Sequence, residues 1–505
     1  MKLNPEAIDL ATLRTLWGGA SASLDEAARD RVARSASLVD RIVAGGETVY
    51  GINTGFGLLA DQRIPGDRLA ELQRNLILSH SCGLGDPLPR HVVRLMILLK
   101  LLGLGRGYSG VRLAVIDALQ YLLDRDAMPV IPAQGSVGAS GDLAPLAHMV
   151  AVLMGEGRID LAGTVLPATE ALRALDLEPL VLGPKEGLAL INGTQASTAI
   201  ALDALFTAER VFGAAIAAGA LSVDALKGSI KPFDPRLHEV RGQPGQIAVA
   251  ARLQALLEGS EILASHGRCG RVQDPYSFRC QPQVMGACLD LLVNASRTLA
   301  IEAAAVTDNP ILFAGTDGNA DEAISGGNFH AQPVAFAADM ISMALCEIGS
   351  LSERRTAVLV DPKMSGLPAF LTDDGGVNSG LMIPQVTAAA LVSENKSLAF
   401  PASVDSIPTS AGQEDHVSMA PIAARKAATI ARNAAGVVAV EFIAAAQGVD
   451  YHAPLRTSAP LRQVHGQVRT LSPRLEGDRY WADEMAALQA AVIGGAFGGA
   501  ESLLG

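Results

Sequence analysis

Long alanine-rich segments constrain the fold of this chain more than any other feature of its sequence. Segments 196–222, 331–360 and 418–447 combine good helix-forming residues with apolar positions three and four residues apart. Shorter segments follow the same pattern at 88–103, 110–124, 283–307, 384–399 and 482–498. Strand signals are few and short. Because alanine lets helix backbones approach closely, the sequence predicts a mainly α fold built on a long central helical bundle.

The 505 residues suit a smaller N-terminal globular region and a long helical body. We expect the N-terminal region to cover residues 1–110 and the bundle body to cover 111–505, as one functional unit. The chain is 49% hydrophobic and only 18% charged, a composition that predicts extensive burial between subunits.

The net charge and the apolar runs of the chain argue against nucleic acid and membrane as binding partners. The formal net charge of −12 argues against a nucleic-acid ligand, since phosphates require a basic field. The apolar run 91–105 contains Arg94 and Lys100, and the run 204–222 contains Glu209 and Arg210. These interruptions predict that no segment crosses a membrane, and we expect a cytoplasmic protein.

The five cysteines show neither a disulfide pattern nor metal-ligand spacing. They stand at Cys82, Cys269, Cys280, Cys288 and Cys346, with no Cys-x-x-Cys pair. The expectation is reduced thiols and no metal site.

Segments rich in glycine, proline and asparagine separate the predicted helices and hold most of the unusual polar residues. They cover 51–57, 129–142, 183–193, 267–282, 315–329, 371–380 and 400–415. Functional residues concentrate in such loops, so we expect helix ends to converge on one site. The run before Asn192 is apolar and strand-like, and Asn192 is expected to follow a strand.

Small residues at 139–141 suggest unusual covalent chemistry. Ala139, Ser140 and Gly141 leave the backbone free to turn sharply, so that the amide nitrogen of Gly141 can attack the carbonyl carbon of Ala139. Ring closure with loss of two waters, one from the Ser140 hydroxyl, yields a methylidene-imidazolone electrophile. The ordinary alternative is a tight turn before a helix that Asp142 caps.

Six loop motifs accompany this triplet in order along the chain: Tyr50–Gly57, Leu78–Gly83, Asn192–Gln195, Gln273–Arg279, Asn328–Ala331 and Gln413–His416. Together with the triplet they resemble the aromatic amino acid ammonia-lyase family, above all its members that act on histidine. The resemblance covers roughly residues 50 to 430, and several motifs in register outweigh the weakness of any single motif.

The resemblance implies an activity, a cofactor and an assembly. It implies non-oxidative elimination of ammonia from L-histidine to give urocanate. The electrophile would be the methylidene-imidazolone that forms autocatalytically from Ala139, Ser140 and Gly141, with no added organic cofactor and no metal. It also implies a homotetramer with sites shared between subunits, and a small-molecule amino acid as the substrate.

Residue roles follow from the same resemblance. Tyr50 would take the β-proton, and Tyr276 and Gln273 would hold the ring and the substrate amino group. Arg279 would bind the carboxylate beside Asn192, and Phe329 would line the pocket. His80, Glu414 and Met382 would recognise the imidazole. The predicted catalytic set is therefore Tyr50, Ala139, Ser140, Gly141, Tyr276 and Glu414, and the substrate-binding set is His80, Asn192, Gln273, Arg279, Phe329 and Met382.

The sequence departs from the family pattern at Gln332, where relatives commonly carry glutamate, and at Phe400, where they commonly carry histidine. Because of these departures, the resemblance does not predict the turnover rate or the pH dependence of the implied activity. Tyrosine or phenylalanine ammonia-lyase activity and 2,3-aminomutase activity remain alternatives within the family. A non-catalytic helical protein, in which the triplet stays uncyclised, is the alternative outside it.

Overall fold

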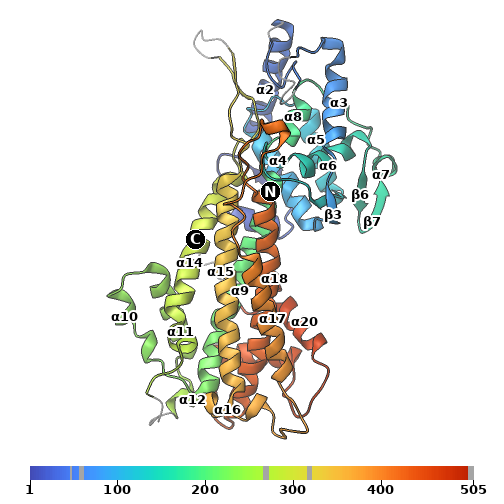
Figure 1. Ribbon diagram of the computed structural model, residues 1–505. Coiled ribbons are helices and arrows are strands. Elements are labelled where there is room, and N and C mark those ends of the chain that lie inside the picture. Colours follow the sequence, from blue (N-terminus) through green and yellow to red (C-terminus); the bar gives the residue numbers. More distant parts are fainter. Residues whose placement is uncertain (46–47, 56–61, 266–271, 316–320, 499–505) are drawn as a thin grey trace. The chain divides into compact units, whose positions relative to one another are not determined.

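The computed structural model describes residues 1–45, 48–55, 62–265, 272–315 and 321–498, and helices dominate it (Figure 1). Contacts divide the chain into two compact units. The first comprises Met1–Asp203, Ser296–Ala338 and Pro401–Arg425, and the second comprises Ala204–Ala295, Asp339–Phe400 and Lys426–Gly505. Both units are therefore assembled from segments far apart in the sequence.

The first unit combines short helices with small sheets. Its helices are α1 (Leu10–Trp17), α2 (Glu26–Gly45), α3 (Leu69–His80), α4 (Arg90–Gly105), α5 (Leu113–Asp124), α6 (Leu143–Ala151), α7 (Ala168–Ala174) and α8 (Glu186–Ile191). Its strands are β1 (Lys2–Leu3), β2 (Ser23–Leu24), β3 (Leu84–Pro87), β4 (Ala127–Pro129), β5 (Pro132–Gln134), β6 (Arg158–Leu161), β7 (Thr164–Pro167), β8 (Ile311–Phe313) and β9 (Glu322–Ile324). Strands β1 and β2 pair in parallel, whereas β3–β5, β4–β6–β7 and β8–β9 are antiparallel.

Three helices of the first unit, α3, α6 and α8, pack against one another. The apolar residues Leu76 and Ile77 of α3, Leu146 of α6 and Leu190 of α8 are buried. Hydrophobic burial of this kind fixes the ends of the three helices relative to each other. Those ends carry the loops that form the site described below.

Long helices supply most of the second unit. Four of its boundaries in the sequence fall within helices, namely α9 (Gln195–Leu226), α14 (Gln281–Ala303), α15 (Gln332–Val360) and α18 (Ala420–Asp450). Its other helices are α10 (Pro235–Glu239), α11 (Pro244–Leu257), α12 (Glu261–Ala264), α13 (Tyr276–Arg279), α16 (Pro362–Ser365), α17 (Met382–Leu398), α19 (Ala459–Leu471) and α20 (Ala482–Gly494).

A buried polar cluster joins three of the long helices in the second unit. Arg355 of α15 donates from Nη2 to Oε2 of Glu441 in α18 at 2.7 Å, and both side chains are fully buried. Ser222 of α9 and Ser352 of α15 also donate to the Glu441 carboxylate. These bonds satisfy a carboxylate that would otherwise be costly to bury, so they specify how α9, α15 and α18 align (Figure 1).

The predicted helices are confirmed, with ends that shift by a few residues. One local prediction was wrong: the apolar run before Asn192 is the short helix α8 (Glu186–Ile191), not a strand. All six residues of α8 are buried, so burial removes the alternation that distinguishes a strand from a helix. The packing against α3 and α6 decides the outcome.

The charged interruptions on which the membrane prediction rests do not keep every helix below the length and hydropathy of a membrane span. Four helices, α9, α14, α15 and α18, are long and apolar enough to cross a membrane by length and composition. The structure buries 89%, 44%, 67% and 72% of their most apolar windows, in that order. In at least three of them the apolar residues thus mainly serve the protein core.

Four cysteines, Cys82, Cys280, Cys288 and Cys346, are free thiols. Cys269 lies outside the described residues. Within the described ranges, no group of three or more His, Cys, Asp or Glu side chains could hold a metal ion.

Candidate functional site

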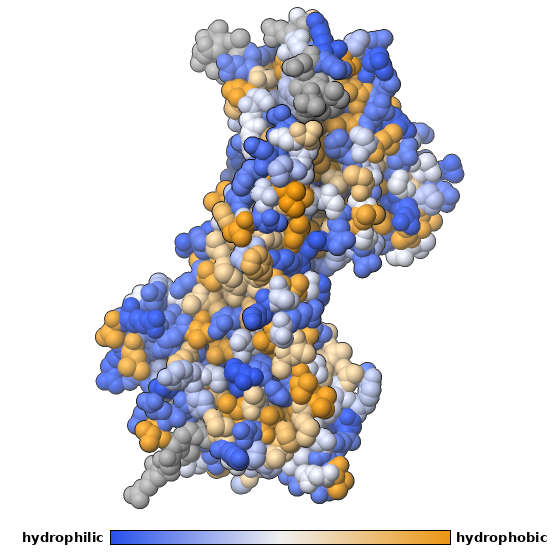
Figure 2. Space-filling view, in the orientation of Figure 1, coloured by the Kyte–Doolittle hydropathy of each residue, from blue (hydrophilic) through white to orange (hydrophobic). Residues whose placement is uncertain are grey.

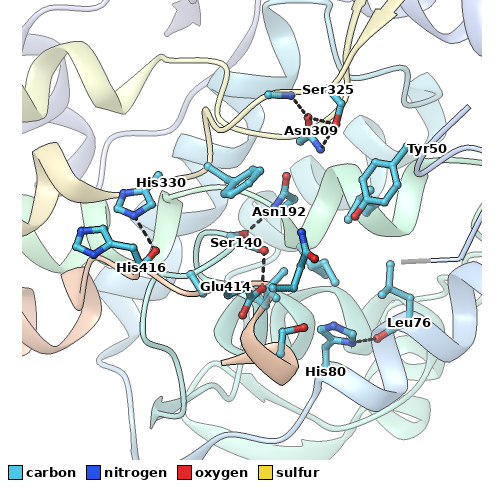
Figure 3. A pocket seen from close by; sticks show the side chains of 18 of the residues that line it. Tyr50, Leu76, His80, Ser140, Asn192, Asn309, Ser325, His330, Glu414 and His416 are labelled. Atoms are coloured by element: carbon cyan, nitrogen blue, oxygen red, sulfur yellow. Dashed lines mark hydrogen bonds between the residues drawn. The ribbon is translucent and has the colours of Figure 1, made fainter. Parts of the chain in front are cut away.

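A cavity of about 810 Å³ lies within the first unit (Figure 3). The ends of α3, α6 and α8 surround it, together with Asn309 and the segments 325–330 and 410–416. Its lining residues are Tyr50, Leu76, His80, Ala139, Ser140, Leu143, Leu188, Ile191, Asn192, Asn309, Ser325, Gly326, Phe329, His330, Ser410, Gln413, Glu414, Asp415 and His416. Six of the seven motifs identified in the sequence therefore contribute to one cavity.

The triplet at 139–141 lies directly before α6, against the loop that follows α8. Gly141 has a φ of +72°, and a Cβ atom there would lie 2.3 Å from the main-chain oxygen of Gly193. The next amide, that of Asp142, donates to the same oxygen at 2.7 Å. Only glycine fits this close approach of two backbones at position 141.

Side chains from distant segments hold the centre of the triplet. Asn192 donates from Nδ2 to the main-chain oxygen of Ser140 at 2.6 Å, and the Ser140 hydroxyl donates to Oε1 of Glu414 at 2.7 Å (Figure 3). The amide and the carboxylate thus contact the residue whose hydroxyl would leave if the predicted ring forms. Together with the glycine at 141, these contacts fit the ring that the sequence predicts.

Two buried charged groups lie next to the triplet. The carboxylate of Asp142 accepts from the amide of Ser197 at 2.6 Å and from the Ser197 hydroxyl at 2.9 Å, so it caps α9 rather than α6. Burial raises the pKa of Asp142 to about 6, although the bonds from Ser197 oppose this shift.

Lys100, in the middle of α4, is the second charged group. Its Nζ donates to the main-chain oxygens of Ala189 at 3.2 Å and Asn192 at 3.0 Å. Burial lowers the pKa of Lys100 to about 7, against the opposing charges of Asp308 and Asp142. The Lys100 amine thus anchors carbonyls at the C-terminal end of α8, next to which the Asn192 side chain reaches the triplet.

His80, the last residue of α3, is oriented by a local hydrogen bond. Its Nδ1 lies 2.8 Å from the main-chain oxygen of Leu76 (Figure 3). Because a carbonyl oxygen only accepts, Nδ1 carries the proton and Nε2 is the acceptor of the neutral ring. Burial lowers the pKa of His80, partly offset by Leu76 and Glu414, and so favours this neutral form.

The remaining cavity residues supply aromatic and imidazole surfaces. The rings of His330 and His416 stack with centroids 5.9 Å apart, and the Nε2 atom of His330 lies 3.2 Å from the main-chain oxygen of His416. Tyr50 and Phe329 line the cavity with them. The cavity therefore offers a phenol, a carboxylate and imidazoles to a small polar ligand.

Four predicted site residues belong to the second unit and do not line this cavity: Gln273, Tyr276, Arg279 and Met382. Gln273 borders a separate cavity of about 1150 Å³. The Arg279 guanidinium lies 4.6 Å from the centre of the Tyr276 ring, and 70% of Tyr276 is exposed. Met382 begins α17. Their assignment to the site stays a prediction.

The two departures from the family pattern lie outside the cavity lining. Gln332 donates from Nε2 to the main-chain oxygen of Ser403 at 3.0 Å, and Phe400 is 75% exposed. Sequence reasoning overlooked Lys100 as part of the site, although a lysine within an apolar helix was a usable signal. It also overlooked Thr409, whose hydroxyl donates to Oε2 of Glu414 at 2.6 Å, because no local pattern indicates that contact.

Comparisons with known proteins agree on one family. The sequence profile of the aromatic amino acid lyase family matches residues 8–470. The chain is 58% identical over 488 residues to a histidine ammonia-lyase of Paracidovorax citrulli (strain AAC00-1), which covers 96% of this chain and 94% of that protein.

Solved structures show the same likeness. The histidine ammonia-lyase of Trypanosoma cruzi has a TM-score of 0.90 at 38% identity, over 99% of this chain and 94% of that one. The tyrosine aminomutase of Streptomyces globisporus has a TM-score of 0.93 at 33% identity, over 98% and 97%. The fold is thus similar in relatives named for two different amino acids.

Proposed function

Because the chain belongs to the aromatic amino acid lyase family, we propose that it eliminates ammonia from L-histidine and releases urocanate. The observation that carries the choice of substrate is that His80 and Glu414 line the same cavity as Ser140. The 58% identity to a protein named histidine ammonia-lyase supports the same choice.

We propose that Ala139, Ser140 and Gly141 form a methylidene-imidazolone. A bond forms between the Gly141 nitrogen and the Ala139 carbonyl carbon. The Ala139 oxygen leaves as water with the hydrogens of the Gly141 and Ser140 amides, and a double bond forms between the Ala139 carbon and the Ser140 nitrogen. The Ser140 hydroxyl leaves as the second water, together with the hydrogen on its Cα. The bond from Asn192 to the Ser140 oxygen and the glycine-only approach at position 141 support this assignment.

The ring supplies an electrophile for the substrate amine. The protein's own side chains would handle the rest of the reaction. Tyr50 would accept the β-proton, and Asn192 would polarise the main-chain oxygen of Ser140 through its 2.6 Å bond. The N-terminus of α6, which begins two residues after Gly141, would favour negative charge at the triplet.

Substrate choice would rest on the hydrogen-bond character of the cavity. His80 presents an acceptor at Nε2, and the Glu414 carboxylate is a second acceptor. A neutral imidazole bears one N–H that donates to such an acceptor, and a protonated imidazole bears two, whereas a phenyl ring leaves both acceptors unpaired. Burying unpaired acceptors is costly, so histidine would be preferred over phenylalanine.

We further propose a homotetramer in which neighbouring subunits complete each site. Gln273, Tyr276, Arg279 and Met382 would then reach the cavity of another subunit. Support comes from apolar side chains that remain exposed on the single chain, among them Ile301 at 76%, Val386 at 52% and Phe336 at 47%. In Figure 2, hydrophobic residues, coloured orange, are visible on the surface of the chain. Exposed apolar surface of this kind is typical of subunit interfaces.

The localisation, the ligand class and the domain division of the chain are also proposed here. We propose a cytoplasmic protein that binds a small amino acid and neither nucleic acid nor membrane, with residues 1–110 as its N-terminal region and 111–505 as its body. The burial of the long apolar helices supports the soluble form.

The direct experiment incubates the purified protein with L-histidine, L-tyrosine or L-phenylalanine, without added cofactor, and follows the absorbance of the conjugated product. We expect urocanate from histidine and slow reaction of the other two. Product analysis also tests the runner-up, because a 2,3-aminomutase yields a β-amino acid. A preference for tyrosine or phenylalanine overturns the substrate proposal.

A further inference from the structure

Two hydroxyl groups hold the Glu414 carboxylate, one at each oxygen. The Ser140 hydroxyl donates to Oε1 at 2.7 Å, and the Thr409 hydroxyl donates to Oε2 at 2.6 Å. Thr409 does not line the cavity, whereas Glu414 and Ser140 do (Figure 3). The carboxylate therefore has one oxygen toward the reactive triplet and one toward its own loop.

The loop that carries both residues is closed on itself. The amide of Thr409 donates to the oxygen of Glu414 at 2.9 Å, and the amide of Glu414 donates back at 3.3 Å. Between them Ser410 and Ala411 adopt φ angles of +51° and +53°. A backbone pair of this kind sets the Thr409 hydroxyl at a defined place beside the Glu414 side chain, independently of any ligand.

Ring formation would affect the hydroxyl groups of Ser140 and Thr409 differently. Under the proposed function, on which this step rests, ring formation removes the Ser140 hydroxyl and with it the donor at Oε1. The Thr409 hydroxyl stays in place. The matured site would thus keep one oxygen of Glu414 anchored and leave the other free to accept from a ligand.

We propose that Thr409 is a positioning residue for substrate recognition: its hydroxyl anchors Oε2 of Glu414 so that Oε1 is presented to the imidazole of the substrate. Thr409 itself contacts neither the substrate nor the ring. A glutamate side chain without such a hydrogen bond populates several rotamers. A charge-assisted hydrogen bond restricts it to one rotamer before the ligand binds.

The test uses ligand binding in the Ser140→Ala variant, so that ring formation and turnover play no part. This variant lacks the same hydroxyl that the ring would lack. Calorimetry measures the Kd of urocanate and of cinnamate, an acrylate with phenyl in place of imidazole. Thr409→Val is added to remove the hydroxyl at nearly constant shape, and Thr409→Ser is added as the matched control that keeps it.

We expect Thr409→Val to weaken urocanate binding about tenfold or more, as loss of a charge-assisted hydrogen bond implies. Thr409→Ser should stay within about twofold of its parent, since its hydroxyl restores the bond. Cinnamate binding should be the same in all three proteins. Mass spectrometry of the single Thr409→Val variant should still show a cyclised triplet.

Unchanged urocanate binding in Thr409→Val overturns the proposal, and so does an equal loss for cinnamate, which would indicate general damage to the cavity. The proposed substrate is judged separately on the parent Ser140→Ala protein. If that parent binds urocanate no better than cinnamate, imidazole recognition fails, and the role of Thr409 fails with it.

Discussion

Asn192 reaches the main-chain oxygen of Ser140 across 52 residues of sequence, with its Nδ2 donating at 2.6 Å. Behind Asn192, the buried Nζ of Lys100 donates to the Asn192 main-chain oxygen at 3.0 Å. The Lys100 amine thus holds the main chain of Asn192, while the Asn192 side chain holds the triplet. This chain of contacts explains how a loop of small residues keeps a defined conformation.

Ring formation predicts a mass deficit. The folded protein should be lighter than its sequence by two waters, with the loss confined to the peptide that contains Ala139, Ser140 and Gly141. Peptide mass mapping measures it. Ser140→Ala should fold normally because the change is small, but should show no such deficit and nearly no turnover. An unmodified triplet in active wild-type protein contradicts the mechanism.

Gly141→Ala should destabilise the protein and prevent ring formation. The added Cβ would meet the Gly193 oxygen at 2.3 Å, at a φ of +72°. We expect a loss of roughly 2 kcal/mol or more in the free energy of unfolding, measured in urea. Gly163→Ala is the matched control, because Gly163 has a φ of +92° with no atom within 4 Å. Equal losses in both variants would show that backbone strain alone is responsible.

Glu414→Gln should lower kcat/KM for histidine by about 10²-fold or more, because it removes the charge that the imidazole N–H would contact under the proposed function. The shape of the side chain is preserved. Activity toward tyrosine should fall much less. Steady-state kinetics with both substrates decide the matter, and equal losses would assign Glu414 to the common elimination chemistry.

Lys100 should make stability depend on pH. Burial lowers its pKa from 10.5 to about 7, so between these values the unfolded chain binds the extra proton and the folded protein does not. The free energy of unfolding should therefore gain a rising contribution as pH increases from about 7 toward 10. Urea unfolding of wild type and Lys100→Met should reveal the difference in slope.

Lys363→Met, at an exposed lysine of the second unit, serves as the control for the Lys100 measurement. Its pH slope should match that of wild type. Parallel slopes for Lys100→Met and wild type would mean that Lys100 remains charged in the folded protein.

Assembly is tested by light scattering, which should give four times the mass of one chain. Shared sites predict complementation as well. Tyr50→Phe and Arg279→Met should each be nearly inactive alone, and co-expression should restore part of the activity, because mixed tetramers contain some sites with neither substitution. A fully active monomer, or mixtures as inactive as the parents, would contradict shared sites.

The sequence by itself determined the helices and indicated the chemistry that we propose for the triplet. Both are local properties: a periodic apolar pattern specifies a helix such as Gln332–Val360, and three small neighbouring residues make ring closure feasible. The order of the loop motifs along the chain was also sufficient to indicate the family.

Only the tertiary structure decided which groups meet. Ser140 and Glu414 are 274 residues apart, and no local pattern encodes their 2.7 Å contact. The residues at 186–191 are all buried, so their pattern is compatible with a strand as well as with a helix, and packing against α3 and α6 selects the helix. Lys100 interrupts an apolar helix in the sequence, but only the fold brings it against the carbonyl of Asn192. Long-range contacts of this kind arise from the burial of whole helices, because a residue's neighbours in space are set by how those helices pack.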